Sequence, residues 1–261
     1  MKKLIFLIVL TALTARVSAQ STPQSLKIPL SRSNQIVIYS DAAFIDAEGY
    51  DGVDILVSPK KADDDTLSKM NLLADNRNSN DSSITYQSKL STGANNFVFN
   101  NIKIITNCRS IKILIPNHIP LLDLEFNTTA SDGRLKVKNY KGPVQIAAYF
   151  SQLEIEGLTG PFAISDEYGK ISVKHIFWSD TAQWSFHNHP YLIRSHSSTI
   201  DITVPPDLKA YFYITKDKGK VYSDKVLDSG LVMNGGGMGI ALESDSGDIF
   251  LKHENNTTIK P

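Results

Sequence analysis

The feature that most constrains this fold is a pair of apolar residues that recurs every nine positions between residues 135 and 173. The two members of each pair are separated by a single residue, and the same spacing returns at 102–113 and 240–251. Alternation of apolar and other residues over so short a length predicts a β-strand with one buried face. The central pairs are Leu135/Val137, Val144/Ile146, Leu153/Ile155, Phe162/Ile164 and Ile171/Val173.

Small residues precede these pairs at a fixed position. Two residues before each pair stand, in order, Gly133, Gly142, Ser151, Gly160 and Gly169. Glycine accepts a positive φ or a crowded turn, so the chain can bend sharply after each strand. Such strand–turn units cannot bury an apolar side alone, whereas stacked units can. The spacing therefore predicts an all-β, single-stranded β-solenoid built from nine-residue units.

The number of units in one turn of the solenoid is suggested by charge. With two units per turn, residues eighteen apart would be neighbours, and Lys136 would lie over Glu154, a favourable cross-strand pair. This arrangement is favoured over a three-sided coil. The alternative fold is an antiparallel meander or sandwich, in which turns also recur every 8–12 residues.

The first nineteen residues are typical of a secretory signal peptide. Lys2 and Lys3 precede a short apolar stretch, and Val17-Ser18-Ala19 provides small residues at a cleavage site. The sequence therefore predicts an exported protein that is periplasmic, secreted or held at the cell surface. No later stretch is long enough for a membrane span. The 27 basic and 27 acidic residues of the whole chain give no sign of a nucleic-acid-binding surface.

The mature chain is expected to form one elongated unit. Residues 20–100 read as an irregular N-terminal β segment that continues into the solenoid at 101–261. A short helix is expected to begin at Asp65 or Thr66 and to end at Leu73. The range 177–198 interrupts the repeat and is rich in aromatic residues and histidine, so it is interpreted as an insertion.

The same insertion holds the candidate ligand-binding residues. Trp178, Trp184 and Tyr191 could form an exposed face that stacks against a sugar or a protein, or they could be buried as a cap. His187 and His189 are two apart and could approach one metal ion from a strand, but a third ligand is not evident. No metal site and no cofactor are predicted.

Three other features have structural explanations. Gly236 to Leu242 imitates a calcium-binding repeat, but Ala241 occupies the aspartate position, so a tight turn is expected. The run at 63–65 is acidic, as helix starts commonly are. Cys108 has no partner for a disulfide and no base beside it, which favours a buried thiol over a nucleophile.

Three stretches resemble the family of bacterial exported proteins catalogued as putative adhesins. They are 48–57 (EGYDGVDILV), the repeats at 131–174, and 234–242 with 246–249. The resemblance spans roughly 35–255 and implies a β-solenoid domain at the cell surface or in the periplasm, with no catalytic residues. The leading hypothesis is an exported, non-catalytic protein that binds an unknown envelope protein or polysaccharide. The alternatives are a secreted carbohydrate-active enzyme, or a structural or signalling protein of the envelope.

Overall fold

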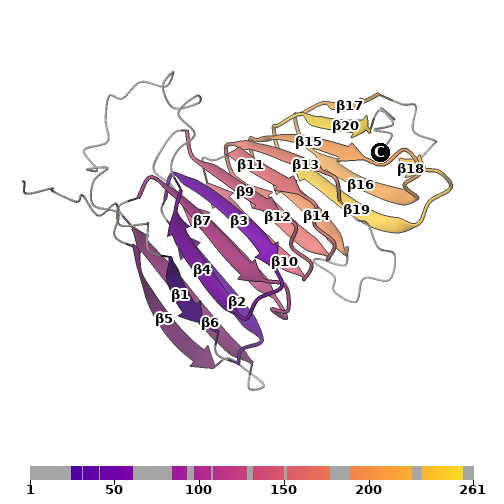
Figure 1. Cartoon of the computed structure of the whole chain (residues 1–261). Coiled ribbons are helices and arrows are strands. Elements are labelled where there is room, and N and C mark those ends of the chain that lie inside the picture. Colours follow the sequence, from indigo (N-terminus) through magenta and orange to yellow (C-terminus); the bar gives the residue numbers. More distant parts are fainter. Residues whose placement is uncertain are drawn as a thin grey trace, which may run out of the picture.

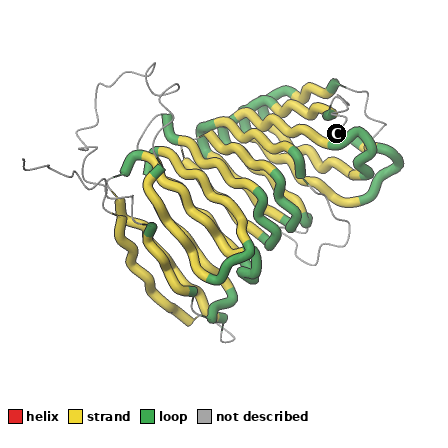
Figure 2. The backbone as a smooth tube through the Cα atoms, in the orientation of Figure 1, coloured by secondary structure: helices red, strands yellow, loops and turns green. Residues whose placement is uncertain are grey.

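A computed structural model describes residues 25–30, 32–40, 42–60, 84–92, 97–106, 108–127, 132–149, 152–176, 189–224 and 231–254. These residues form β-strands and contain no helix, and short loops join the strands along the edges of an elongated stack (Figures 1 and 2). The strands are β1 (Leu26–Pro29), β2 (Gln35–Ser40), β3 (Phe44–Tyr50), β4 (Asp54–Pro59), β5 (Ile84–Thr92), β6 (Val98–Thr106), β7 (Ser110–Pro116), β8 (Leu122–Asn127), β9 (Arg134–Lys138), β10 (Val144–Tyr149), β11 (Gln152–Glu156), β12 (Phe162–Asp166), β13 (Lys170–Lys174), β14 (Tyr191–Ser195), β15 (Thr199–Val204), β16 (Ala210–Lys216), β17 (Val221–Ser223), β18 (Val232–Met233), β19 (Met238–Ser244) and β20 (Ile249–His253).

The strands form two mixed sheets of ten strands each. Sheet A has the order β1-β4-β7-β3-β9-β11-β13-β15-β20-β17, and sheet B has the order β18-β16-β19-β14-β12-β10-β8-β2-β6-β5. From β6 to β15 consecutive strands belong to opposite sheets, so hairpins do not join them (Figure 1). We call one strand of sheet B together with the following strand of sheet A a coil.

Parallel pairing joins each coil to the next with an offset of eighteen residues in the centre of the stack. Leu135 pairs with Leu153, and Leu153 pairs with Ile171 in sheet A. In sheet B, Val144 pairs with Phe162. The neighbours expected from two nine-residue units per turn are therefore the observed neighbours.

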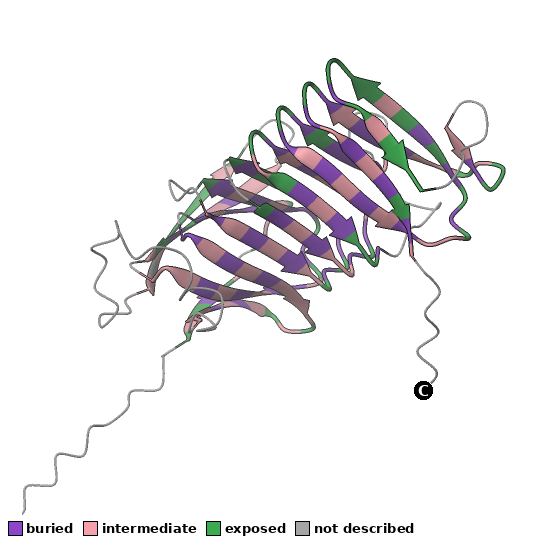
Figure 3. Ribbon diagram, turned by 90° about the horizontal axis from the view of Figure 1, so that it is seen from above, coloured by how far each residue is buried: buried purple, intermediate pink, exposed green. Residues whose placement is uncertain are grey.

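The apolar pairs of the repeat form the core between the sheets. All ten residues of the five central pairs are at most 1% exposed. Burial alternates along most of the strands, with inward residues buried and outward residues partly or fully exposed, whereas β2, β14 and β19 each have three consecutive buried residues (Figure 3). Full burial of one such side chain contributes about 1.5–3 kcal/mol, so the repeat supplies most of the driving force for stacking.

Glycine is required in the turns because neighbouring coils approach closely. A Cβ atom added to Gly160 would lie 2.3 Å from the carbonyl oxygen of Gly142, the equivalent residue one coil earlier. At Gly247 it would lie 1.8 Å from the carbonyl oxygen of Ser198. Among the described glycines, positive φ is found at Gly157, Gly235 and Gly236 and not at these two positions. Close backbone approach, rather than a left-handed conformation, explains these two glycines.

The coils do not follow one another in chain order at either end of the stack. The first coil, β2–β3, lies between β6–β7 and β8–β9, and the last coil, β19–β20, lies between β14–β15 and β16–β17. Antiparallel strands then flank the outermost coils: β4 pairs with β7, β5 with β6, and β18 with β16. The first and last coils thus lie one coil inside the ends of the stack, while β1 forms the edge of sheet A beside β4, and strands from 35–50 share the sheets of the later repeats.

The range 177–198 was too wide for an insertion, because β14 occupies Tyr191–Ser195 in regular parallel register with β12. The repeat resumes at Tyr191, whose side chain takes an inward position. The signal peptide at 1–19 and the helix expected at 65–73 lie outside the described residues.

Candidate binding surface

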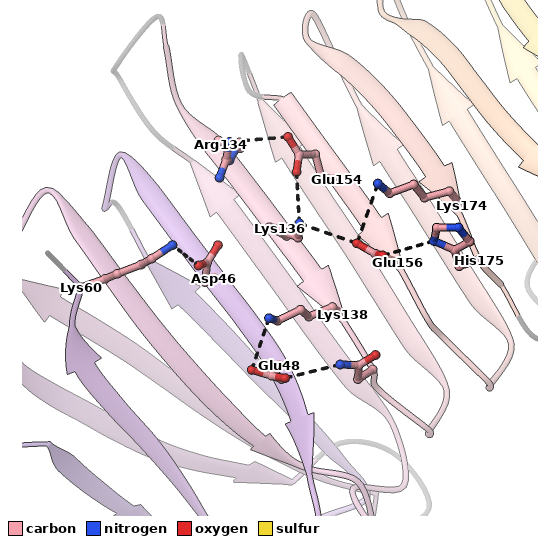
Figure 4. Close-up of polar contacts among 11 residues, drawn as sticks. Asp46, Glu48, Lys60, Arg134, Lys136, Lys138, Glu154, Glu156, Lys174 and His175 are labelled. Atoms are coloured by element: carbon pink, nitrogen blue, oxygen red, sulfur yellow. Dashed lines mark hydrogen bonds and ion pairs between the residues drawn. The ribbon is translucent and has the colours of Figure 1, made fainter. Parts of the chain in front are cut away.

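The outer face of sheet A carries a ladder of ion pairs between neighbouring strands (Figure 4). Glu48 on β3 lies 2.9 Å from Lys112 on β7 and 3.6 Å from Lys138 on β9. Glu154 lies 3.6 Å from both Arg134 and Lys136. The hydrogen bond from Lys112 is the main reason that the pKa of Glu48 lies below its ordinary value.

The ladder continues to the far end of sheet A. Glu156 contacts Lys136, Lys174 and His175, and Asp201 lies 2.8 Å from Lys252. Each carboxylate thus meets a cation supplied by a neighbouring coil. Partly exposed pairs of this kind add little stability individually, but they leave few charges on this face to attract a partner.

The outer face of sheet B is different because it is hollowed by a groove. Its larger part has a volume of about 700 Å³, and a second part of about 410 Å³ shares Glu125, Ala147, Ser165 and Arg194 with it. The groove crosses the parallel strands β8, β10, β12, β14, β19 and β16, which are adjacent in this order. Six strands at a spacing of about 4.8 Å give it a length of about 24 Å along the stack.

Small outward side chains form the floor. Ala147 pairs with Ser165 across β10 and β12, and Ser165 pairs with Arg194 across β12 and β14. Glu125 borders Ala147 on the other side, from β8. The longer side chains of Glu125 and Arg194 therefore lie on either side of the short side chains of Ala147 and Ser165, and this difference in length creates the hollow.

Two basic side chains of the groove are paired with acids of the next coil, and a third basic residue, Lys216, also lines the groove. Arg194 Nε donates to Glu243 Oε2 at 2.6 Å, and His196 Nδ1 lies 2.7 Å from Asp245 Oδ2. Glu167, Asp217 and Glu125 also line the groove, and no described Lys or Arg forms an ion pair with any of the three. The groove therefore has an acidic balance.

One carboxyl group at the edge of the groove has a perturbed pKa. Burial, with a further contribution from the charge of Glu125, raises the pKa of Asp123 to about 6. Gln35 Nε2 donates a hydrogen bond to Asp123 Oδ2 at 3.1 Å, and this bond acts to lower the pKa of Asp123. The two acids are two residues apart on β8, on the same face of the sheet.

Exposed tyrosines lie along the side of the groove where the strands enter their turns. Tyr149 is 40% exposed and Tyr168 is 45% exposed. Their rings meet edge to face with centroids 5.5 Å apart, and Tyr168 meets the His196 ring in the same way at 5.8 Å. The three rings form an aromatic rim along one side of the groove.

The residues predicted from the sequence to bind a ligand do not line this groove in the described part of the chain. Tyr191 is fully buried, with its ring 5.2 Å from that of Phe162, so it belongs to the core and offers no surface. Its position in the repeat, inward like the first member of every pair, is the physical reason. Trp178, Trp184 and His187 lie outside the described residues, as does the acidic run at 63–65.

The other candidates contribute no chemistry here. His189 is partly buried and packs against the Tyr213 ring at 4.6 Å. Across the described part of the chain, no group of three or more His, Cys, Asp or Glu could hold a metal ion. Cys108 is partly buried against the core, and Gly235 and Gly236 form a turn before β19. The described ranges include no helix with the length and hydropathy needed to cross a bilayer.

No family model matches the sequence, and no curated protein matches it. A solved structure of a putative cell adhesion protein from Clostridium sporogenes can be aligned over 89% of this chain and 100% of its own length, with a TM-score of 0.38 and 8% sequence identity.

Proposed function

We propose that this chain is an exported, non-catalytic β-solenoid that binds a component of the cell envelope through the groove on sheet B. The eighteen-residue offset between paired strands and the alternation of strands between sheets support the solenoid interpretation. The charged, apolar and small-residue segments of positions 1–19 support export. N-terminal sequencing of the secreted or periplasmic protein should then begin at Gln20.

The single observation that carries the proposal is the difference between the two outer faces. Sheet A pairs its own charges, whereas sheet B has a long groove with an aromatic rim and an acidic balance. Concave sites with a few well-placed polar groups are where proteins commonly bind ligands. A long parallel stack also offers an extended binding surface, as repeat proteins generally do.

A matched pair of substitutions tests which face makes contact. Ser165 on β12 and Ser172 on β13 belong to one coil, point outward and are partly buried, but they lie on sheet B and sheet A respectively. Ser165→Gln should lower binding of the purified mature protein to a washed envelope fraction by fivefold or more, because it fills the floor of the groove. Ser172→Gln should leave binding unchanged. Equal binding by both variants would contradict the proposal and favour a structural or signalling role.

A second candidate function is hydrolysis of a polysaccharide. The observation that favours it is the pair Asp123 and Glu125, which share one face of β8 about 7 Å apart and differ in environment. Glycoside hydrolases use two carboxyl groups at comparable separations, one of them with a raised pKa. A reducing-sugar assay on a polysaccharide panel tests it: activity lost in Asp123→Asn and Glu125→Gln would support an enzyme, and no turnover by the unmodified protein would exclude this pair as its catalytic centre for those substrates.

A further inference from the structure

We infer that the ligand of the sheet B groove is a neutral polysaccharide chain lying along the stacking axis. This inference rests on the proposed function and adds the ligand class and the residues that select it.

The shape of the groove requires an extended ligand. The hollow crosses six adjacent strands and is open along its length, with Ala147 and Ser165 at its floor. A small compact molecule would contact only a few of these strands. A chain with a repeating unit could contact each coil in turn, because the coils present equivalent positions at a constant spacing of about 4.8 Å.

The hydrogen-bonding groups of the groove belong to side chains. Strands β8, β10, β12, β14 and β19 each have hydrogen-bonded neighbours on both sides, so their backbone groups are used within the sheet. An extended peptide therefore cannot add to the sheet here as an extra strand. The side chains that line the groove include carboxylates, which accept hydrogen bonds, hydroxyls, which donate and accept, and the Lys216 ammonium and Arg194 guanidinium, which donate. Sugar hydroxyls both donate and accept, and they suit this mixed set.

The aromatic rim provides the apolar contact that a sugar ring needs. Tyr149 is outward on β10, its ring meets that of Tyr168, and it lines the groove together with Glu167 and His196. A tyrosine ring combines a flat apolar face with a polar hydroxyl. The C–H face of a pyranose can pack on such a ring while its hydroxyls remain hydrogen-bonded to neighbouring polar groups.

The charge of the groove selects against anionic chains. Arg194 and His196 are paired with Glu243 and Asp245, and the remaining charged groups of the lining are mainly carboxylates. A polymer of uronate, sulfate or phosphate would be repelled by these carboxylates. Both Nε and Nη2 of Arg194 lie 2.6 Å from Glu243 Oε2, so the charge of this guanidinium is compensated within the groove.

The test uses affinity electrophoresis in gels that contain dextran, mannan or xylan as neutral probes, alginate as an anionic probe and chitosan as a cationic probe. The unmodified protein should be retarded by at least one neutral polymer and not by alginate. Tyr149→Ala should weaken that retardation about tenfold, and Tyr149→Phe should retain it. Tyr222→Ala is the matched control, since Tyr222 is 43% exposed on sheet A and stacks on Phe250 at 4.8 Å.

The outcomes separate this inference from the proposed function. Retardation by alginate or chitosan alone, or equal retardation of Tyr149→Ala and the unmodified protein, would overturn the neutral-polysaccharide inference. If no polymer retards the protein while Ser165→Gln still lowers envelope binding, the groove remains the contact surface, and the inference that its ligand is a neutral polysaccharide is wrong. Treatment of the envelope fraction decides the same question independently: periodate, which cleaves sugar diols, should abolish binding, and protease should not. Loss of binding after protease alone would identify a protein partner.

Discussion

Lys136 lies beside Glu154 in the parallel register of β9 and β11, with its Nζ atom 3.6 Å from Oε2 of the glutamate. The two residues are eighteen apart in the sequence, so the contact reports the length of one coil. It also belongs to the ladder that neutralises the outer face of sheet A. The eighteen-residue register therefore determines how the coils stack, and it also brings together the opposite charges that distinguish the outer face of sheet A from that of sheet B.

The first prediction concerns this ladder. Glu154→Lys would place a third cation beside Arg134 and Lys136 and should destabilise the protein by about 1 kcal/mol, since like charges on paired strands repel. Glu154→Gln should cost less, because it removes attraction without adding repulsion. Urea unfolding at low and high salt measures both changes. A penalty for Glu154→Lys that does not shrink with salt would contradict an electrostatic cause.

The second prediction concerns the turn glycines. Gly160→Ala should destabilise the fold by about 1–3 kcal/mol, because the new methyl group would overlap the backbone of the coil before it. Gly142→Ala is the matched comparison one coil earlier. Its nearest contact is the Tyr140 hydroxyl at 2.8 Å, a less severe overlap than that at Gly160, so a smaller effect is expected. The midpoints of urea unfolding decide the order, and a larger effect at Gly142 would be inconsistent with this account.

The third prediction concerns pH. Because the pKa of Asp123 is raised to about 6 in the folded protein, that state keeps a proton which the unfolded chain has already lost near pH 4. Stability should therefore fall as pH rises between about 4 and 6, and the loss should be complete above that range. Asp123→Asn cannot ionise. Its melting temperature should exceed that of the unmodified protein at pH 7.5, and the difference should shrink or reverse at pH 4; a difference that does not change with pH would refute the raised pKa.

The fourth prediction concerns the order of the coils. The last coil, β19–β20, has a parallel neighbour on each side, while among the described strands β17 pairs with β20 alone. Amide hydrogens of β19 and β20 should therefore exchange about as slowly as those of β12 and β13, in spite of their position near the end of the chain. Amides of β17 should exchange sooner. Rapid exchange throughout β20 would indicate that the last coil is not held between its neighbours.

Much of the core could be predicted from the sequence, because inward positions must be apolar wherever coils stack. The pairs from Leu135 to Val173 are all buried, and the opposite charges of Lys136 and Glu154 indicated the correct offset. The order of the coils could not be predicted. Each coil offers the same backbone ladder on both of its sides, so nothing in the local sequence says that β19–β20 must enter between two earlier coils.

The position of Tyr191 could have been predicted, but the aromatic content around it was misleading. Tyr191 and Ile193 are followed nine residues later by Ile200 and Ile202, and all four are fully buried. The repeat therefore resumes at Tyr191. The many aromatic residues nearby suggested that Tyr191 stacks on a ligand at the surface, whereas its spacing in the repeat predicts the inward position that it occupies.

The groove also left a signal in the sequence. Outward positions of every second unit hold charged residues, such as Lys136 and Glu154, while Ala147, Ala163 and Ser165 belong to the units between them. With two units per coil, this pattern separates a charged face from a small-residue face. Tyr149 and Tyr168 could not be placed beside it from spacing alone, because both lie where strands end and turns begin.

The most direct measurement of the central claim is protection of the groove from chemical labelling when the protein is bound. Ser165→Cys and Ser172→Cys, each in a Cys108→Ala background, place one thiol on sheet B or on sheet A of the same coil. With the washed envelope fraction present, maleimide should label the Ser165→Cys protein several times more slowly than without it, and the rate for Ser172→Cys should not change. Protection at position 172 alone, or at neither position, would contradict binding through the sheet B groove.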